Sequence, residues 1–207
     1  KFDPATYSDA IAFARIGEGS LGGKARGLAF MNSMLVKYSQ YAKYENVRVT
    51  IPRTVVVATD YFDAFIRNNG LEYVLTTEMT DEEILSEFVS STLPYKLREA
   101  LKAYVRTVSG PLAVRSSSKL EDSHYQPFAG IYSTYMIPYT EGNEDRQLRL
   151  LQKAIKSVYA STYFAASKAY VQSSQNLIAE EKMAVVIQEV CGTEQDVLFE
   201  QIEDGWF

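Results

Sequence analysis

The sequence has very little of what builds disulfide frameworks, metal centres or membrane anchors. Its 207 residues include one cysteine, Cys191, and one histidine, His124. A single cysteine excludes an internal disulfide, and nothing points to an oxidising compartment. No apolar run approaches the roughly 18 residues of a transmembrane helix, and no signal peptide is visible at the start. We therefore expect a cytoplasmic protein with no membrane partner.

Positive charge is also scarce. The chain has 21 Lys and Arg residues against 26 Asp and Glu residues, which gives a net charge of −5 and a pI near 5.1. A general nucleic-acid-binding surface is normally basic, so nucleic acid is not an expected partner. The histidine His124 has no obvious partner, and we assign it no role. The hydrophobic content of 46% fits one large domain or two small lobes with a sizeable core.

Helical and strand-like patterns follow one another along the chain. Apolar periodicity predicts helices at 4–16, 22–44, 60–69, 80–91, 94–108 and 143–175, and strands within 47–58, 111–118, 131–137, 183–190 and 196–202. Pro52 interrupts the first strand segment, which predicts two short strands or one bulged strand. A break in the last helix is expected near Thr162, and a soft boundary between two parts falls at 109–111.

Two acidic segments are read as helix starts. The sequence Thr80-Asp81-Glu82-Glu83 predicts a capping box rather than a metal site, because carboxylates are favoured in a first helical turn. Thr59 or Asp60 is expected to cap the helix that Asn69-Gly70 closes. No metal-binding residue is predicted from either segment.

The most informative stretch is the glycine-rich segment of residues 17–23 and the helix start after it. Lys24 and Arg26 lie in the first helical turn, where each cation costs about 0.3–1 kcal/mol against the helix dipole. An anion over that helix N-terminus would reverse the cost, because free N–H groups, the dipole and both cations would point at it. Gly22 and Gly23 would let the backbone approach such a ligand. The segment predicts a phosphate site; a flexible turn with solvated cations is the alternative.

A second anion-friendly segment lies at the end of the predicted 111–118 strand. Arg115 presents a planar fork of donors that suits phosphate oxygens, and Ser116 and Ser117 add hydroxyls directly after it. Ligand groups are commonly placed where a strand opens into a loop. The alternative is a loop in which Arg115 pairs with Glu121 or Asp122 and the serines act as caps.

Several segments, in this order, resemble the N-terminal nucleotide-binding domain of phosphoenolpyruvate synthase and pyruvate phosphate dikinase. Leu21 to Ala29 is similar to the family's Gly-Gly-Lys signature, and Ile51 to Phe65 to its Pro-x-apolar-apolar-Thr-Thr segment. Its most telling motif, Val-Arg-Ser-Ser…Glu-Asp…Phe-Ala-Gly, corresponds to Val114–Ser117, Glu121–Asp122 and Phe128–Gly130. Further similar segments are Ser157–Ser161 and Met183–Gln188, so the resemblance covers about residues 15–192.

The resemblance implies an α+β, ATP-grasp-like fold: two α/β lobes of mixed sheet and helices, with ATP between them. It implies that Lys24 and Arg115 contact the phosphates and act in catalysis, and that Ser116 and Ser117 shape the same loop. It further implies that the strand segment Gln188, Glu189, Val190 and Cys191 meets adenine, which suits an apolar slot read by backbone groups. The whole chain, 1–207, would be the N-terminal part of such a domain and a fragment of a longer chain, with a lobe boundary near 109–111.

In the full-length enzyme the resemblance implies phosphoryl transfer from ATP to a carrier histidine and then to pyruvate. The carrier histidine, the pyruvate or phosphoenolpyruvate site and the Mg²⁺ ligands belong to parts beyond this chain, and the full-length protein could be a homodimer. One departure is that Ala166 and Val171 stand where the family usually carries arginines. That departure favours the alternative of a non-catalytic nucleotide-sensing or interaction module. A domain with no ligand is expected only if the Lys24 and Arg115 segments lie far apart.

Overall fold

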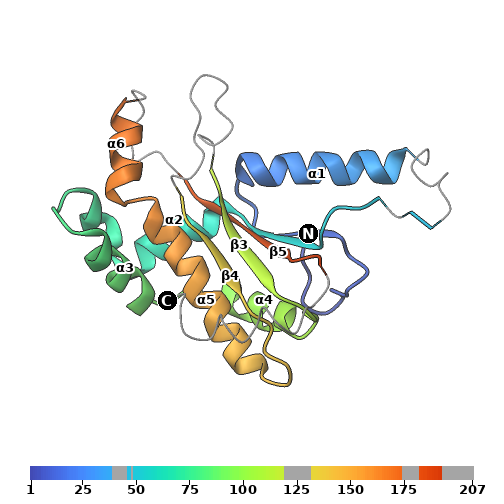
Figure 1. The fold of residues 1–207 in the computed structure, drawn as a ribbon. Helices are drawn as coiled ribbons and strands as arrows, with labels where there is room; N and C mark the ends of the chain where they lie inside the picture. The colour runs from blue at the N-terminus through green and yellow to red at the C-terminus, as the bar shows by residue number, and fades with distance from the viewer. Residues whose placement is uncertain (39–45, 48, 119–131, 174–181, 193–207) are drawn as a thin grey trace.

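The fold is built around one mixed β-sheet (Figure 1), and the computed structural model describes residues 1–38, 46–47, 49–118, 132–173 and 182–192. The sheet order is β1-β2-β5-β3-β4. β1 and β2 are parallel, whereas β5 is antiparallel to both β2 and β3, and β4 is antiparallel to β3. The expected α+β class is confirmed. The strands are β1 (Phe13–Ile16), β2 (Thr54–Val57), β3 (Leu112–Ser117), β4 (Thr134–Ile137) and β5 (Ala184–Glu189).

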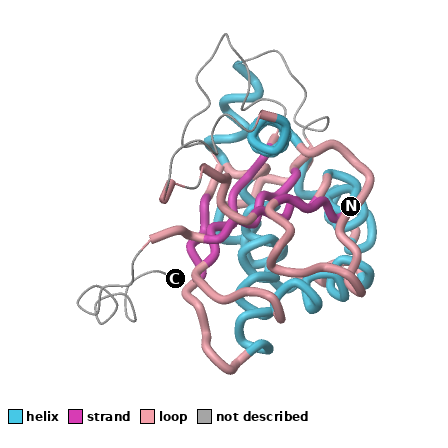
Figure 2. Tube along the Cα trace, turned by 90° about the vertical axis from the view of Figure 1, so that its right-hand side faces the viewer, coloured by secondary structure: helices cyan, strands magenta, loops and turns pink. Residues whose placement is uncertain are grey.

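The helices are divided unequally between the two sides of the sheet. Figure 1 shows α1 apart from the group formed by α2, α3, α4 and α5, and in Figure 2, turned by 90°, α1 is seen almost end-on. This division leaves one helix for one face and several for the other. The helices are α1 (Gly22–Lys37), α2 (Thr59–Asn69), α3 (Asp81–Ser90), α4 (Tyr95–Val105), α5 (Glu144–Ser161) and α6 (Ala165–Ser173), with a 3₁₀ helix η2 at Leu71–Leu75.

The alternation of side chains along each strand explains the two faces. Successive residues point to opposite sides of a strand, so alternate strand residues belong to different clusters. The larger cluster, which we call the core face, includes Val55, Val57, Leu112, Val114, Val185 and Ile187 from the strands and Phe65, Phe88, Leu101 and Ile155 from the helices. The smaller cluster, on what we call the α1 face, consists of Ala25, Val56, Ala184 and Val186, with Phe13, Leu21 and Leu28 packed against it.

Several local predictions are confirmed. Thr80 and Glu83 form a capping box at the start of α3, and Pro94 directly precedes α4. Gly70 ends α2 in the left-handed conformation with a φ of 64°. The long C-terminal helical segment breaks at Thr162, between α5 and α6. In each of these places a local rule decides the structure, so the sequence pattern is sufficient.

The predicted helix at 4–16 is wrong. Residues 4–6 form a turn in which Asp3 accepts hydrogen bonds from Ala5 N and Tyr7 N, and Phe13–Ile16 form strand β1. The strand forms because it pairs with β2 in parallel and buries Ile16. Helical periodicity was present in the sequence, but pairing with a distant strand overrides such a local preference.

The helix predicted for 22–44 ends earlier in the structure. α1 ends at Lys37, and residues 39–45 lie outside the described part of the chain. Its expected apolar stripe is only half buried: Leu28 and Leu35 are partly covered, whereas Met31 is 48% exposed. The face turned to the sheet is set by the small buried residues of the first turn, which allow a close approach of α1 to the strands.

Other boundaries differ in similar ways. Only Thr54–Val57 of the predicted 47–58 strand segment pairs in the sheet, starting just after Pro52. α4 ends at Val105, short of 108. The strand predicted at 196–202 and the loop 119–130, with its His124, Glu121 and Asp122, lie outside the described residues. Residues on both sides of 109–111 contribute strands to one sheet, so the two-lobed ATP-grasp arrangement stays an expectation.

Candidate functional site

The N-terminus of α1 meets the end of β3, although the two segments are far apart in the sequence. Lys24 Nζ donates a hydrogen bond to Ser116 Oγ, 3.2 Å away and 92 residues further along the chain. The Gly-Gly-Lys segment and the Arg-Ser-Ser segment are therefore in contact in the structure. The reading of a domain with no ligand required these segments to lie apart, and that condition is not met.

The first turn of α1 is bound to β3 through its backbone. Gly23 N donates to Ser118 O at 2.9 Å, and Ala25 N donates to Ser117 Oγ at 3.1 Å. The Ser117 hydroxyl in turn donates to Leu21 O at 2.8 Å. These N–H groups are thus already satisfied within the chain, which differs from the expectation that free N–H groups would receive an anion. Phosphate contacts at this place would fall mainly to side chains.

Gly22 is required by how closely this turn approaches β3. Its φ is +68°, and a Cβ added there would lie 1.9 Å from Ser117 O. No side chain fits at that distance, and the left-handed backbone itself favours glycine. Both Gly22 and Gly23 are buried. In this structure they bring Lys24 to the strand end by close packing, rather than by lining an open loop.

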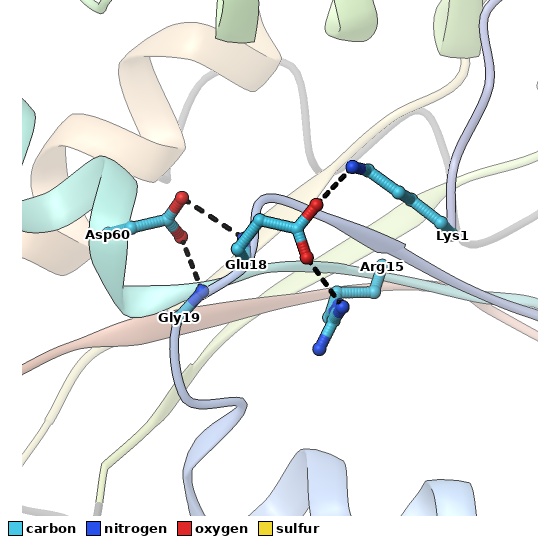
Figure 3. A network of polar contacts seen from close by, with 5 residues as sticks. All are labelled: Lys1, Arg15, Glu18, Gly19 and Asp60. Atoms are coloured by element: carbon cyan, nitrogen blue, oxygen red, sulfur yellow. Dashed lines mark hydrogen bonds and ion pairs between the residues drawn. The ribbon is translucent and has the colours of Figure 1, made fainter.

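The loop that precedes α1 is held by the start of α2. Glu18 N and Gly19 N donate to the two carboxylate oxygens of Asp60, at 3.1 and 3.0 Å (Figure 3). Ser20 N donates to Thr59 Oγ1 at 2.9 Å. The prediction that Thr59 or Asp60 caps α2 is wrong, because the helix has Ala58 at its N-cap position and no side-chain cap. Sequence reasoning missed the role of these side chains, and only the parallel pairing of β1 with β2 could have indicated it.

Strand register places Arg115 on the α1 face. Arg115 lies opposite Val186, and Ser117 lies opposite Ala184, across the β3–β5 pair. Both partners belong to the small cluster that α1 covers. Because directly opposite residues share a face, Arg115 and Ser117 point to the side of the sheet on which α1 packs. Arg115 is partly exposed there, whereas its neighbour Val114 is buried in the core face.

The predicted adenine segment lies towards the other end of the same strands. Gln188 is opposite Ala113 and its Nε2 donates to Thr54 Oγ1 at 3.3 Å. Val190 N donates to Pro111 O at 3.0 Å. On β5, Val185 lies opposite Ser116 and four residues before Glu189. At about 3.3 Å per residue, these two positions are about 13 Å apart. An extended nucleoside triphosphate is long enough to bridge the two ends.

Glu189 points away from this face and belongs to a buried polar group. Arg53 Nε donates to Glu189 Oε1 at 2.7 Å, and its guanidinium also contacts Thr107 O. Burial acts to lower the pKa of Arg53, but the hydrogen bond and charge of Glu189 outweigh it and raise that pKa. Burial also raises the pKa of nearby Tyr7 to about 12. The ion pair holds the start of β2 and the end of β5 together, while Cys191 beyond it is exposed.

A hollow of about 380 Å³ lies elsewhere, between the end of α4 and the start of α5. Its lining includes Arg106, Glu144 and Gln147, none of which belongs to the predicted site. Within the described ranges, no group of three or more His, Cys, Asp and Glu side chains is placed to hold a metal ion. None of the helices in that same part of the chain is long and apolar enough to cross a membrane.

Comparison with known proteins gives two findings. The family described as "Pyruvate phosphate dikinase, AMP/ATP-binding domain" matches residues 18–197. The chain is also 30% identical over 151 residues to a Bacillus subtilis (strain 168) protein named "Uncharacterized phosphotransferase YvkC". That similarity covers 70% of this chain and 16% of the relative, so the chain spans a small part of the relative's length.

Proposed function

This chain belongs to the pyruvate phosphate dikinase AMP/ATP-binding domain family, and we propose that it holds ATP on the α1 face of its sheet. The observation that carries the proposal is the contact between Lys24 and Ser116, which joins the two anion-friendly segments at one strand end. Arg115 lies on the same face by register. Two cationic side chains and a serine hydroxyl therefore belong to the same end of β3, which is where we place the polyphosphate.

The phosphates would be bound by side chains more than by a backbone cradle. Lys24 supplies a compact charge and Arg115 a planar fork that suits phosphate oxygens. Ser116 and Ser117 shape the strand end, and Ser117 also holds the first turn of α1. Phosphoryl transfer needs positioning and charge neutralisation rather than covalent help from the protein, and these groups can supply both.

Adenine would lie towards Gln188–Cys191. The Val190 N–H group is already used within the sheet, as is that of Glu189, which donates to Arg53 O at 2.9 Å. Adenine contacts in this segment would therefore come from the Gln188 side chain and from the backbone beyond Val190. Gln188 shares the α1 face with Arg115, because the two residues alternate with core-face residues along paired strands.

In the full-length protein we propose a phosphotransferase that passes a phosphoryl group from ATP to a carrier histidine and then to pyruvate. Both acceptors and the carboxylates for Mg²⁺ would belong to other parts of that protein. The name of the Bacillus subtilis relative, a phosphotransferase, supports this class. The second candidate is a nucleotide-sensing module, which Ala166 and Val171 favour because they replace the arginines usual in the family.

Calorimetric titration of this chain with ATP, with and without Mg²⁺, tests the proposal. The double variant Lys24→Ala/Arg115→Ala is compared with the control Lys102→Ala/Arg106→Ala, which removes the same number of positive charges from the end of α4, a helix that packs on the core face. Both control side chains are exposed, near the end of α4. The proposal expects the parent and the control to bind ATP with similar affinity and the first variant to lose binding.

Equal binding by the two double variants would contradict the placement of the site. If the parent chain binds no ATP, the proposal for this chain is contradicted. Binding without any transfer by the full-length protein would favour the nucleotide-sensing candidate instead.

A further inference from the structure

We propose that Asp60 is a positioning residue: it holds the 17–20 loop and thereby fixes Lys24 where the phosphates would lie. This inference rests on the proposed ATP site, and it gives Asp60 a role that the resemblance to the family does not assign to it. Asp60 lies in the first turn of α2, on the element that follows β2. Its reach to the loop after β1 is possible because β1 and β2 are parallel neighbours.

Four hydrogen bonds join the 17–20 loop to the start of α2. The Asp60 carboxylate accepts from Glu18 N and Gly19 N, one to each oxygen. The Thr59 hydroxyl accepts from Ser20 N, and Thr59 N donates to Ser20 O at 3.0 Å. Hydrogen bonds to a carboxylate are stronger than those between neutral groups, so Asp60 is the main contributor.

The glycines of the loop fit this carboxylate closely. A Cβ at Gly17 would lie 2.4 Å from Asp60 Oδ1, and one at Gly19 would lie 2.5 Å from Asp60 N. Gly17 also has a φ of +96°, which side-chain-bearing residues rarely adopt. The absence of side chains at these two positions therefore serves the approach of Asp60, rather than the approach of a ligand.

The loop is also held from its outer side. Glu18 forms ion pairs with Arg15, at 2.9 Å, and with Lys1 (Figure 3). Both Lys1 and Glu18 are well exposed, so these pairs contribute little by themselves. They hold the Glu18 side chain beside Arg15 and Lys1, whereas the Glu18 backbone N–H group donates to Asp60.

The loop transmits its position to Lys24 over a short stretch of chain. Ser20 Oγ accepts from Gly22 N at 3.3 Å, and Gly23 N is bound to Ser118 O. The start of α1 is thus fixed at two places, by α2 before it and by β3 beneath it. Releasing the loop from Asp60 would leave the two Ser20–Thr59 hydrogen bonds and the β3 contacts to set the direction of Lys24.

The variant Asp60→Asn tests this with little change in shape. An amide can accept from only one of the two N–H groups, and its own NH₂ group opposes the other. Asp63→Asn is the matched control, because Asp63 lies in the same helix and pairs with Lys182 instead. Thr59→Val is a second variant, which removes the hydroxyl bound to Ser20 N and keeps the carboxylate.

Each variant is measured in the 207-residue chain by amide hydrogen exchange and by titration with ATP and with adenosine. We expect Asp60→Asn to speed exchange at Glu18 and Gly19 and to weaken ATP binding roughly 10-fold, the size of one lost charge-assisted hydrogen bond. The expected 10-fold loss of ATP affinity corresponds to about 1.4 kcal/mol. Adenosine affinity should stay within about 2-fold of the parent value, because adenosine makes no phosphate contact. Asp63→Asn should change none of these.

The outcomes separate this inference from the proposed function. If the parent binds ATP and Asp60→Asn binds it as Asp63→Asn does, the positioning role is wrong and the ATP site stands. An equal loss of ATP and adenosine binding would indicate general destabilisation and would also overturn it. If the parent binds no ATP, the proposed function fails and the role of Asp60 towards phosphate fails with it, whatever the exchange at Gly19 shows about the loop.

Discussion

The two faces of the sheet differ in how they are packed. The core face meets α2, α3, α4 and α5 and forms a large apolar cluster (Figures 1 and 2). Among the described residues, the cluster on the α1 face has four buried apolar members. The residues on the core face are large and mostly fully buried. Those on the α1 face are small, and charged or polar side chains such as Arg115 and Lys24 lie beside them.

This difference separates stability from ligand binding. Apolar burial is the main source of folding free energy, so the core face carries most of it. The α1 face contributes little burial and leaves room for polar side chains at the end of β3. We expect substitutions on the core face to change the stability of the chain, and substitutions on the α1 face to change nucleotide binding.

The largest effect should come from the core face. Leu101 in α4 is fully buried, and Leu101→Ala should lower the free energy of unfolding by about 2–5 kcal/mol, because it removes apolar contacts and leaves a cavity. Urea denaturation measures this. ATP affinity of the folded fraction should stay within about 2-fold. A selective loss of ATP affinity with unchanged stability would break the division between the faces.

The next effect should appear on the α1 face. Arg115→Ala should weaken ATP binding by about 1.5–3 kcal/mol, the scale of a hydrogen bond to a charged group. Stability should change by less than about 0.5 kcal/mol, because Arg115 is partly exposed on the strand. Titration and urea denaturation of the same sample check both parts. Arg106→Ala, at the end of the core-face helix α4, is the control and should leave ATP affinity unchanged.

A smaller effect should depend on pH. Burial raises the pKa of Tyr104, on the core face, above its ordinary value of 10.0. Below pH 10 both states keep the proton; above it only the unfolded chain loses its proton readily, so stability falls as pH rises. Between pH 8 and 11, the free energy of unfolding of Tyr104→Phe should therefore fall less than that of the parent. The difference should be at most about 1.4 kcal/mol for each pH unit above 10. Parallel pH profiles of the two proteins would contradict this.

The smallest effect should come from the outward side of α1. Met31 is 48% exposed, and Met31→Ser should change the free energy of unfolding by less than about 0.5 kcal/mol. Thermal or urea unfolding measures this. A loss as large as that of Leu101→Ala would mean that α1 packs as a core helix, and the comparison between the faces would fail.

The sequence predicts most where local rules decide. The capping box at Thr80, the left-handed Gly70 and the break at Thr162 follow from side-chain chemistry within a few residues. Strand β3, which carries Arg115, is recognised by its apolar run, and its family motif is specific. The meeting of Lys24 with Ser116 could be expected from the resemblance, because both segments are motifs of one site.

Long-range pairing decides the rest. Phe13–Ile16 has helical periodicity but becomes a strand because β2 lies beside it. Asp60 looks like a helix cap, and only the neighbouring loop after β1 turns its carboxylate to Gly19 N. The same packing satisfies the N–H groups of the first turn of α1, which the sequence indicates as free. Such contacts depend on strand order, which no local pattern reveals.

The most direct test of the account is to map ATP binding along the backbone by NMR chemical shifts. The account predicts the largest changes at Lys24, Arg115 and Ser116, with little change at the core-face residues Leu97 and Leu101. Changes concentrated around the hollow beside Gln147, or spread evenly over both faces, would contradict a nucleotide site on the α1 face.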